Sequence, residues 1–168
     1  MNTDELRKLQ APLKEKYRED PGSATVTLKA KARLGEGITC KVETGKSMAA
    51  AGLHPATGGD GLSVCSGDML LEALVACAGV TLNAVSTATG IGVRDAVISA
   101  EGDLDFRGTL AVSKDAPVGF KAIRLNFEID SDASDSQLKK LVELTERYCV
   151  VYQTLVNAPT IIIDLVSV

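Results

Sequence analysis

The chain of 168 residues has the size and composition of one globular domain. Hydrophobic residues make up 45% of it and charged residues 24%, which disfavours long-range disorder. The net charge of −4, the aromatic content of 4% and the absence of tryptophan disfavour a basic, base-stacking surface for nucleic acid. We therefore expect a folded protein that has no nucleic-acid partner.

The N-terminal segment and the cysteines indicate the cellular compartment in which the protein works. The first twenty residues are rich in charge and lack the apolar core of a signal peptide. We therefore expect a cytoplasmic protein without a structural disulfide framework. Cys40, Cys65, Cys77 and Cys149 show neither a CxxC motif nor paired metal-ligand spacing, and His54 is the one histidine. These features disfavour a metal site, and we expect no cofactor.

The first third of the chain predicts a helix, a hairpin and a loop. Residues 3–19 predict a polar helix with a stripe of leucines along one side. Residues 24–33 and 38–44 alternate apolar and polar side chains, which predicts the two strands of a hairpin. Residues 45–61 are rich in Gly, Ala, Pro and Thr and predict a loop that crosses to the next element.

Residues 68–89 predict a long apolar helix. Asp68 is the expected N-cap, and Gly90 the expected end. No charged residue occurs from position 73 to position 93, so a membrane span is one alternative. Hydroxyl and amide side chains crowd the second half, and no Lys/Arg cluster flanks the helix. We therefore expect no membrane partner and a central helix that is covered on all sides.

The remainder predicts two strands, a second helix and a last strand. Residues 94–107 and 118–130 predict long strands joined by a turn. A capping-box pattern opens a predicted helix over residues 134–157, and residues 160–168 predict the final strand. The expected fold class is α+β, with the element order β-β-α-β-β-α-β and one domain.

Cys77 and Cys149 are both predicted to lie in the middle of a helix among apolar neighbours. One interpretation is that both are small buried hydrophobic residues, which is the usual role of a free cysteine. The other is a reactive thiol pair. In that case one thiolate reduces a peroxide and becomes a sulfenic acid, which the second thiol converts to a disulfide.

The reactive interpretation requires a group that ionises the attacking thiol. Cys77 lies more than two turns from the predicted start of its helix, so that helix's dipole contributes little. A cation from elsewhere is therefore expected, and Arg33 and Arg147 are the candidates. On a regular helix Arg147 points about 200° away from Cys149, which favours Arg33.

Two segments carry a resemblance to a known family. The stretch GLSVCSGDMLLEALVACAGVTL resembles the first-cysteine helix of the OsmC/organic hydroperoxide resistance family, and ERYCVVYQTL resembles its second-cysteine helix. The predicted element order also fits that family. The resemblance covers residues 23–168 as an OsmC-like domain and leaves residues 1–22 as an N-terminal helical extension.

The resemblance implies an assembly and a reaction. Family members are intertwined homodimers with the long helices at the centre, antiparallel sheets wrapping both ends and active sites at the dimer interface. They reduce organic hydroperoxides with a dithiol as reductant, in an antioxidant stress response. On the matching positions of this sequence, the resemblance implies that Cys77 is the peroxidatic cysteine, which attacks the peroxide, and that Cys149 is the resolving cysteine, which forms the disulfide. Arg33 from the other subunit, held by Asp68, activates the thiolate.

Departures from the family pattern keep an alternative open. The hydroperoxide reductases usually have Pro-Glu before the first helix, where residues 66–68 are SGD, and Pro-Val-Ser after the second cysteine, where residues 150–152 are VVY. A role as a helix cap therefore explains Asp68 as well as a role in holding the activating arginine does. Cys65 is a further candidate resolving thiol, and His54 is expected to be an ordinary loop residue. The alternative function is an OsmC-like homologue, not a peroxidase, that binds an apolar small molecule between the helices.

Overall fold

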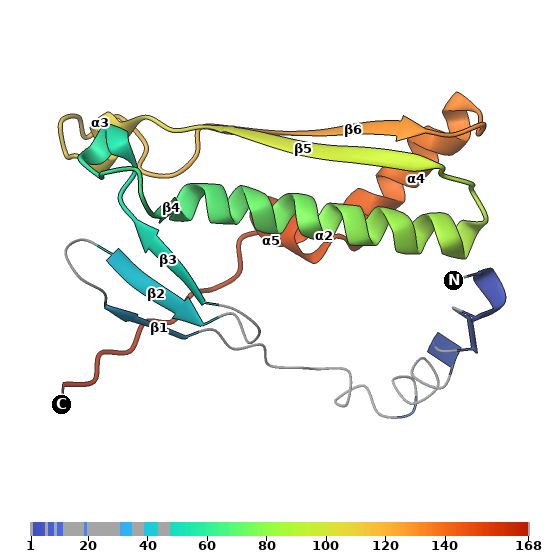
Figure 1. The fold of residues 1–168 in the computed structure, drawn as a ribbon, viewed down its shortest axis with the longest axis horizontal. Helices are drawn as coiled ribbons and strands as arrows, with labels where there is room; N and C mark the ends of the chain where they lie inside the picture. The colour runs from blue at the N-terminus through green and yellow to red at the C-terminus, as the bar shows by residue number, and fades with distance from the viewer. Residues whose placement is uncertain are drawn as a thin grey trace.

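The computed structural model has a mixed α+β architecture, as predicted (Figure 1). It describes residues 2–5, 7–8, 10–11, 19, 31–34, 39–43 and 48–167. Residues 3–5, 7–8 and 10–11 are helical, in agreement with the N-terminal helix predicted there. The hydroxyl group of Thr3 donates a hydrogen bond of 2.9 Å to the carbonyl oxygen of Thr87. This bond ties the N-terminal segment to the long helix of the domain.

A four-stranded sheet forms one side of the molecule. Its strands are β1 (Lys31–Leu34), β2 (Thr39–Glu43), β3 (Met48–Gly52) and β4 (Val64–Cys65), in that order across the sheet. The predicted hairpin is confirmed for the described residues, because β1 and β2 pair antiparallel. The sheet is not wholly antiparallel as expected, since β3 and β4 run parallel.

Strand β3 lies within residues 45–61, so the prediction of a loop over that whole segment was wrong. Its sequence, MAAAG, has little intrinsic preference for a strand. The strand exists because every residue from Met48 to Gly52 pairs with β2. A short 3-10 helix, η2 (Pro55–Thr57), follows it.

Helix α2 (Ser66–Thr89) is the long apolar helix that the sequence predicts. It ends at Gly90, whose φ of 74° is a left-handed conformation that glycine adopts without steric cost. The N-cap prediction was wrong, because Cys65 occupies the cap position and makes no side-chain cap bond. Asp68 lies instead in the first turn, where an exposed carboxylate still interacts favourably with the helix dipole.

A two-stranded sheet covers α2. Strands β5 (Asp95–Asp103) and β6 (Ala122–Asp130) pair antiparallel over nine residues each. Exposed and half-buried side chains alternate along both strands, as the sequence pattern predicts. The connection between them contains a short helix that was not predicted, α3 (Phe106–Thr109), which the Asp105 carboxylate caps by accepting from the Arg107 N–H group.

The second predicted helix is two helices. Helix α4 (Asp135–Tyr148) opens with the predicted capping box, in which the Ser134 hydroxyl accepts from the Gln137 N–H group. Helix α5 (Val150–Val156) follows after one extended residue, Cys149, with ψ of 109°. The prediction of one unbroken helix over residues 134–157 was therefore wrong.

Side-chain hydrogen bonds to carbonyl groups occur across the break and within the end of α4. The amide nitrogen of Gln153 donates to the carbonyl oxygen of Glu146 at 2.9 Å. The hydroxyl group of Thr145, which is fully buried, donates to the carbonyl oxygen of Leu141. The first of these bonds satisfies a carbonyl group that the end of α4 leaves without its usual partner.

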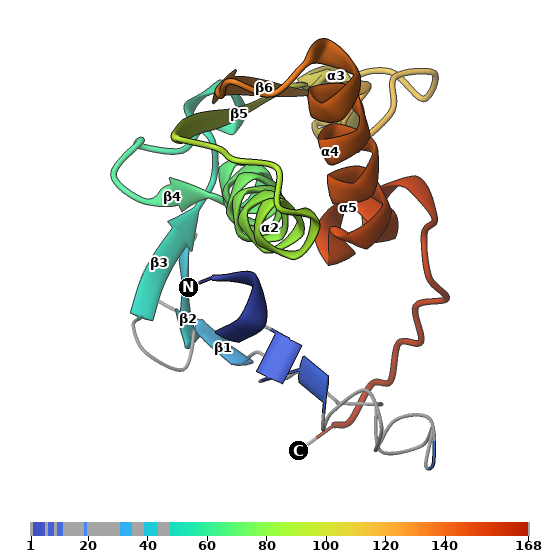
Figure 2. The same ribbon diagram turned by 90° about the vertical axis from the view of Figure 1, so that its right-hand side faces the viewer.

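The elements form layers around α2. Seen along that helix, β5 and β6 lie above it, α4 and α5 lie along one side, and β3 and β4 lie on the other (Figure 2). Leu82, Val85 and Leu141 form the buried centre of the core. The side chains packed around them are Ile91, Val93, Ala96, Ile98, Phe127, Ile129 and Leu144.

The described residues leave one face of α2 exposed. Leu74, Ala78, Leu82 and Val85 are buried, but Val80 on the other face is 73% exposed. By length and composition alone α2 is apolar enough to cross a membrane, a property it shares with the core helices of soluble proteins. The expectation that α2 is covered on all sides is not met by the described residues of one chain.

The C-terminal segment also lacks cover. Residues 158–167 follow α5 without regular structure, and they trail away from the helices (Figure 1, Figure 2). The prediction of a strand over residues 160–168 is wrong for the described residues 160–167, because no described strand pairs with them. The exposed apolar side chains of this segment are Ile161, Ile162, Ile163, Leu165 and Val166.

Candidate functional site

The fold brings Cys77 and Cys149 together. Cys77 lies half-buried in the middle of α2, and Cys149 lies at the junction of α4 and α5, where it is 1% exposed. Helix α2 packs against both α4 and α5. The two thiols lie close enough that each one shifts the pKa of the other. The pairing of these two cysteines was expected from the sequence, although Cys149 was placed wrongly in mid-helix.

The pKa of Cys77 lies below the ordinary value of a thiol. Burial raises it, but hydrogen bonds to the sulfur outweigh that effect. The donors are the backbone N–H groups of Val151 and Val150, the Cys149 thiol and the Thr81 hydroxyl group. Each donor stabilises the thiolate more than the neutral thiol, which lowers the pKa. Cys77 is therefore the thiol that ionises first.

The pKa of Cys149 shifts in the opposite direction. Burial raises it, and the neighbouring Cys77 raises it further, because a thiolate there disfavours a second negative charge. Hydrogen bonds from the N–H groups of Tyr152 and Val151 oppose this shift only in part. The site can therefore hold one accessible thiolate on Cys77 beside one buried, protonated thiol on Cys149.

The helix break is the source of this arrangement. The first N–H groups of a helix have no partner within it. Since α5 begins at Val150, its first two N–H groups are free to point at the Cys77 sulfur. Sequence reasoning missed both donors, because it expected an unbroken helix there. It also missed Thr81, although its position four residues after Cys77 places both side chains on one helix face.

The other predicted residues lie apart from the thiols. The backbone of Arg33 is in β1, at the far edge of its sheet from β4 and α2, and its side chain lies outside the described part of the chain. Asp68 is exposed in the first turn of α2. Arg147 is exposed and lies over the Tyr148 ring, 5.5 Å from its centroid. Asp68 lies nine residues before Cys77 on α2, and only the backbone of Arg33 is described, so their roles at Cys77 stay predictions.

A cavity of about 450 Å³ lies between β6 and the helices α4 and α5, lined by sequence neighbours of the two thiols and not by Cys77 or Cys149 themselves. Leu74, one helical turn before Cys77, lines it, as does Tyr152, whose N–H group bonds to Cys149. Most of its other walls are apolar, and Lys121 and Glu146 are the charged residues among them. Such a cavity fits a small, largely apolar molecule.

Cys65 and His54 lie at the N-terminal end of α2, where both line a second cavity. Cys65 is twelve residues from Cys77, so this position gives no support to Cys65 as an alternative resolving thiol. Among the residues that the structure describes, no group of three His, Cys, Asp or Glu side chains could hold a metal ion.

Comparison with known proteins identifies the family to which the sequence is similar. Residues 58–164, well over half of the chain, match the family model described as OsmC-like protein. A comparison with curated proteins finds no match.

Solved structures show the same fold. An OsmC-like protein from Mycoplasma pneumoniae is 20% identical, with a TM-score of 0.67 over 79% of this chain and 89% of the other. An organic hydroperoxide resistance protein OsmC from Legionella pneumophila is 18% identical, with a TM-score of 0.62 over 79% and 90%. An organic hydroperoxide resistance protein from Elizabethkingia anophelis is 16% identical, with a TM-score of 0.63 over 79% and 91%.

Proposed function

Because the chain belongs to the OsmC-like family, we propose that it is a thiol-dependent peroxidase that reduces organic hydroperoxides. The observation that carries this proposal is the contact between Cys77 and Cys149 with opposite pKa shifts. Peroxide reduction needs one ionised, reachable thiol as nucleophile and one neighbouring thiol to form a disulfide. The two similar structures described as organic hydroperoxide resistance proteins support the same activity.

The proposed reaction has three steps. The Cys77 thiolate attacks one oxygen of the hydroperoxide, the O–O bond breaks, and the alkoxide leaves and takes up a proton to become an alcohol. Cys77 is then a sulfenic acid, and attack by the Cys149 sulfur forms the disulfide and releases water. An external dithiol reduces this disulfide, so that each turnover converts one hydroperoxide and one dithiol to an alcohol, water and an oxidised dithiol.

The cavity between β6 and the helices, which neighbours of the thiols line, supports an organic substrate. Its apolar walls would take the organic group of a hydroperoxide, whereas hydrogen peroxide gains nothing from them. With dithiothreitol as reductant, we expect cumene hydroperoxide to be consumed at least about tenfold faster than hydrogen peroxide at equal concentration. Equal rates, or no consumption above the rate without protein, would contradict the proposal.

A second function is supported by the same cavity. An OsmC-like protein that binds an apolar small molecule without reducing it would also use a space of about 450 Å³ between β6 and the helices. The replacement of the family's usual residues at positions 66–68 and 150–152 favours this alternative. The two functions differ in one measurable way, because a binder retains its free thiols after exposure to hydroperoxide.

We also propose that the active unit is a cytoplasmic homodimer. The exposed apolar side chains on α2 and in residues 158–167 need a partner surface. A second copy of the chain would bury them in an interface well above about 2,000 Å². In such a dimer, Arg33 of one copy would reach Cys77 of the other, and Asp68 would hold its guanidinium group through a charge-assisted hydrogen bond.

Alkylation of Cys77 as a function of pH tests the activation of the thiol. The alkylation rate follows the thiolate fraction, so a lowered pKa moves its midpoint below that of an ordinary thiol. Thr81→Val removes one donor to the thiolate and should move the midpoint to higher pH, with several-fold slower alkylation near neutral pH. Thr87→Val, on the same helix but with a hydroxyl group that donates to the Asn83 carbonyl group, is the matched control. Identical curves for Thr81→Val and wild type would exclude a role for Thr81.

The same measurement tests Arg33. If its guanidinium group reaches Cys77 from the second copy, Arg33→Ala should also raise the midpoint, and the loss should be recovered at high pH. Arg147→Ala removes an arginine that lies over Tyr148 and should leave the curve unchanged. If the curves for Arg33→Ala and wild type coincide, Arg33 does not activate Cys77. The N–H groups of α5 and the Thr81 hydroxyl group would then stabilise the thiolate without a cation.

A further inference from the structure

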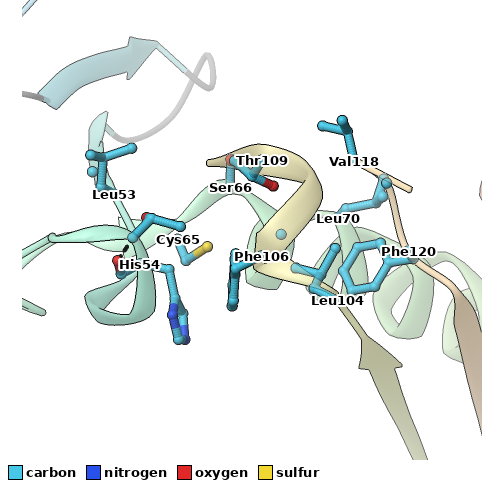
Figure 3. A pocket seen from close by; sticks show the side chains of 14 residues that line it. Leu53, His54, Cys65, Ser66, Leu70, Leu104, Phe106, Thr109, Val118 and Phe120 are labelled. Carbon is cyan, nitrogen blue, oxygen red and sulfur yellow. Dashed lines mark hydrogen bonds between the residues drawn. The ribbon is translucent and has the colours of Figure 1, made fainter. Parts of the chain in front are cut away.

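A second cavity, of about 380 Å³, lies at the N-terminal end of α2 (Figure 3). Three parts of the chain form it: the segment after β3, the junction of β4 with α2, and the connection between β5 and β6. Cys65 at this cavity and Cys77 at the thiol pair are twelve residues apart, about 18 Å along a helix. Neither thiol of the pair lines this cavity, which shares one wall residue, Phe120, with the cavity between β6 and the helices. The apolar walls of this second cavity are Leu53, Leu70, Leu104, Phe106, Val118 and Phe120.

The aromatic side of the cavity is held in place by specific contacts. The His54 ring stacks on the Phe106 ring, with the centroids 5.0 Å apart and the planes 20° from parallel. The Nδ1 atom of His54 accepts a hydrogen bond of 3.0 Å from the Ala56 N–H group, which fixes the imidazole ring. The Cys65 sulfur points toward Phe106 (Figure 3). One thiol therefore faces a preformed apolar space bounded by aromatic rings.

We propose that this cavity is a second ligand site, which binds a compact, uncharged aromatic molecule. Its volume lies within the range of small-molecule sites, about 300–1,000 Å³. Aromatic walls favour an aromatic ligand through offset or edge-to-face contacts. Among the described residues that line the cavity, none is Asp, Glu, Lys or Arg, so a charged group would lose its hydration without gaining a counter-charge. The polar side chains that line the cavity are His54, Thr57, Cys65, Ser66 and Thr109, and they offer hydrogen-bond partners to a hydroxyl substituent on the ligand.

Gly67 provides a way to fill the cavity. A Cβ atom on this residue would lie 3.5 Å from the side chains of Leu104 and Phe120 and 3.7 Å from the Cys65 sulfur, which is ordinary van der Waals contact. The side chain of Gly67→Leu would therefore project among the cavity's own walls. Gly92→Leu is the matched control, because a Cβ atom there meets nothing within 4 Å and Gly92 does not line this cavity.

The experiment measures modification of Cys65 in a Cys77→Ser, Cys149→Ser background, so that it does not depend on peroxidase activity. The probe is 2-naphthol, whose dissociation constant is obtained from its own fluorescence. The rate at which N-ethylmaleimide modifies Cys65 is followed by peptide mass spectrometry with and without the probe. At a probe concentration of ten times the dissociation constant, we expect about tenfold slower modification.

The variants decide whether protection comes from this cavity. Gly67→Leu should abolish the protection of Cys65, and Gly92→Leu should retain it. Any 2-naphthol bound between β6 and the helices would leave Cys65 unprotected in both variants. If Gly67→Leu does not fold, Val118→Trp fills the cavity from its rim, where Val118 is 65% exposed. Absence of protection by 2-naphthol, or equal protection in the filled variants, would overturn the proposal. So would protection of Cys65 without probe that rises with protein concentration, since a second copy would then cover the cavity.

Discussion

Cys77→Ser is expected to reduce consumption of cumene hydroperoxide to the rate observed without protein. The serine hydroxyl group keeps nearly the same shape but is not ionised near neutral pH, so it cannot attack the O–O bond. The hydrogen bonds from Val150, Val151 and Thr81 that stabilise a thiolate are too weak to ionise an alcohol. The measurement is steady-state peroxide consumption with dithiothreitol, over a range of pH.

Two matched serine variants separate the roles of the thiols. Cys149→Ser should complete one turnover and stop with Cys77 as a sulfenic acid, which dimedone traps. Cys65→Ser makes the same substitution outside the thiol pair and should retain wild-type turnover. Wild-type turnover by Cys77→Ser would show that the peroxidatic residue is assigned wrongly.

Val80→Glu is expected to convert the dimer to a monomer. Val80 is 73% exposed in the single chain, so a carboxylate there remains hydrated while the chain is monomeric. In a dimer that buries this face of α2, each copy would place an unpaired carboxylate in an apolar interface. Desolvation of each charge costs several kcal/mol, and each 1.4 kcal/mol weakens association about tenfold. We expect the dimer dissociation constant to rise by at least about a thousandfold.

Light scattering and sedimentation at micromolar concentration measure this effect. Val112→Glu is the matched control, because Val112 is 72% exposed and lies in the connection between β5 and β6. It should remain a dimer with the wild-type dissociation constant. A wild-type protein that is monomeric at micromolar concentration would exclude the proposed assembly, and a dimeric Val80→Glu would place the interface elsewhere.

The elements predicted well are those with local signals. The uncharged run over residues 73–93 and the glycine at position 90 predict α2 and its end, and the Ser134–Gln137 capping box predicts the start of α4. The alternation along β5 and β6 predicts two long strands, although α3 between them was missed. In each case the sequence positions that decide the structure lie within the element itself.

The elements predicted wrongly depend on distant parts of the chain. Strand β3 has the alanine-rich sequence MAAAG and is defined by its pairing with β2. The break at Cys149 occurs in a sequence without glycine or proline, and the Gln153 side chain satisfies a carbonyl group across it. The chemistry at Cys77 depends on this break, so the source of the lowered pKa could not be predicted from composition and spacing.

The number of thiols lost per chain after one equivalent of cumene hydroperoxide tests the proposed function most directly. Free thiols are titrated under denaturing conditions, and the oxidised protein is mapped by peptide mass spectrometry. We predict the loss of two thiols per chain and a disulfide between Cys77 and Cys149, with Cys65 still free. Retention of all the thiols, or a disulfide that joins other cysteines, would contradict a peroxidase built on this pair.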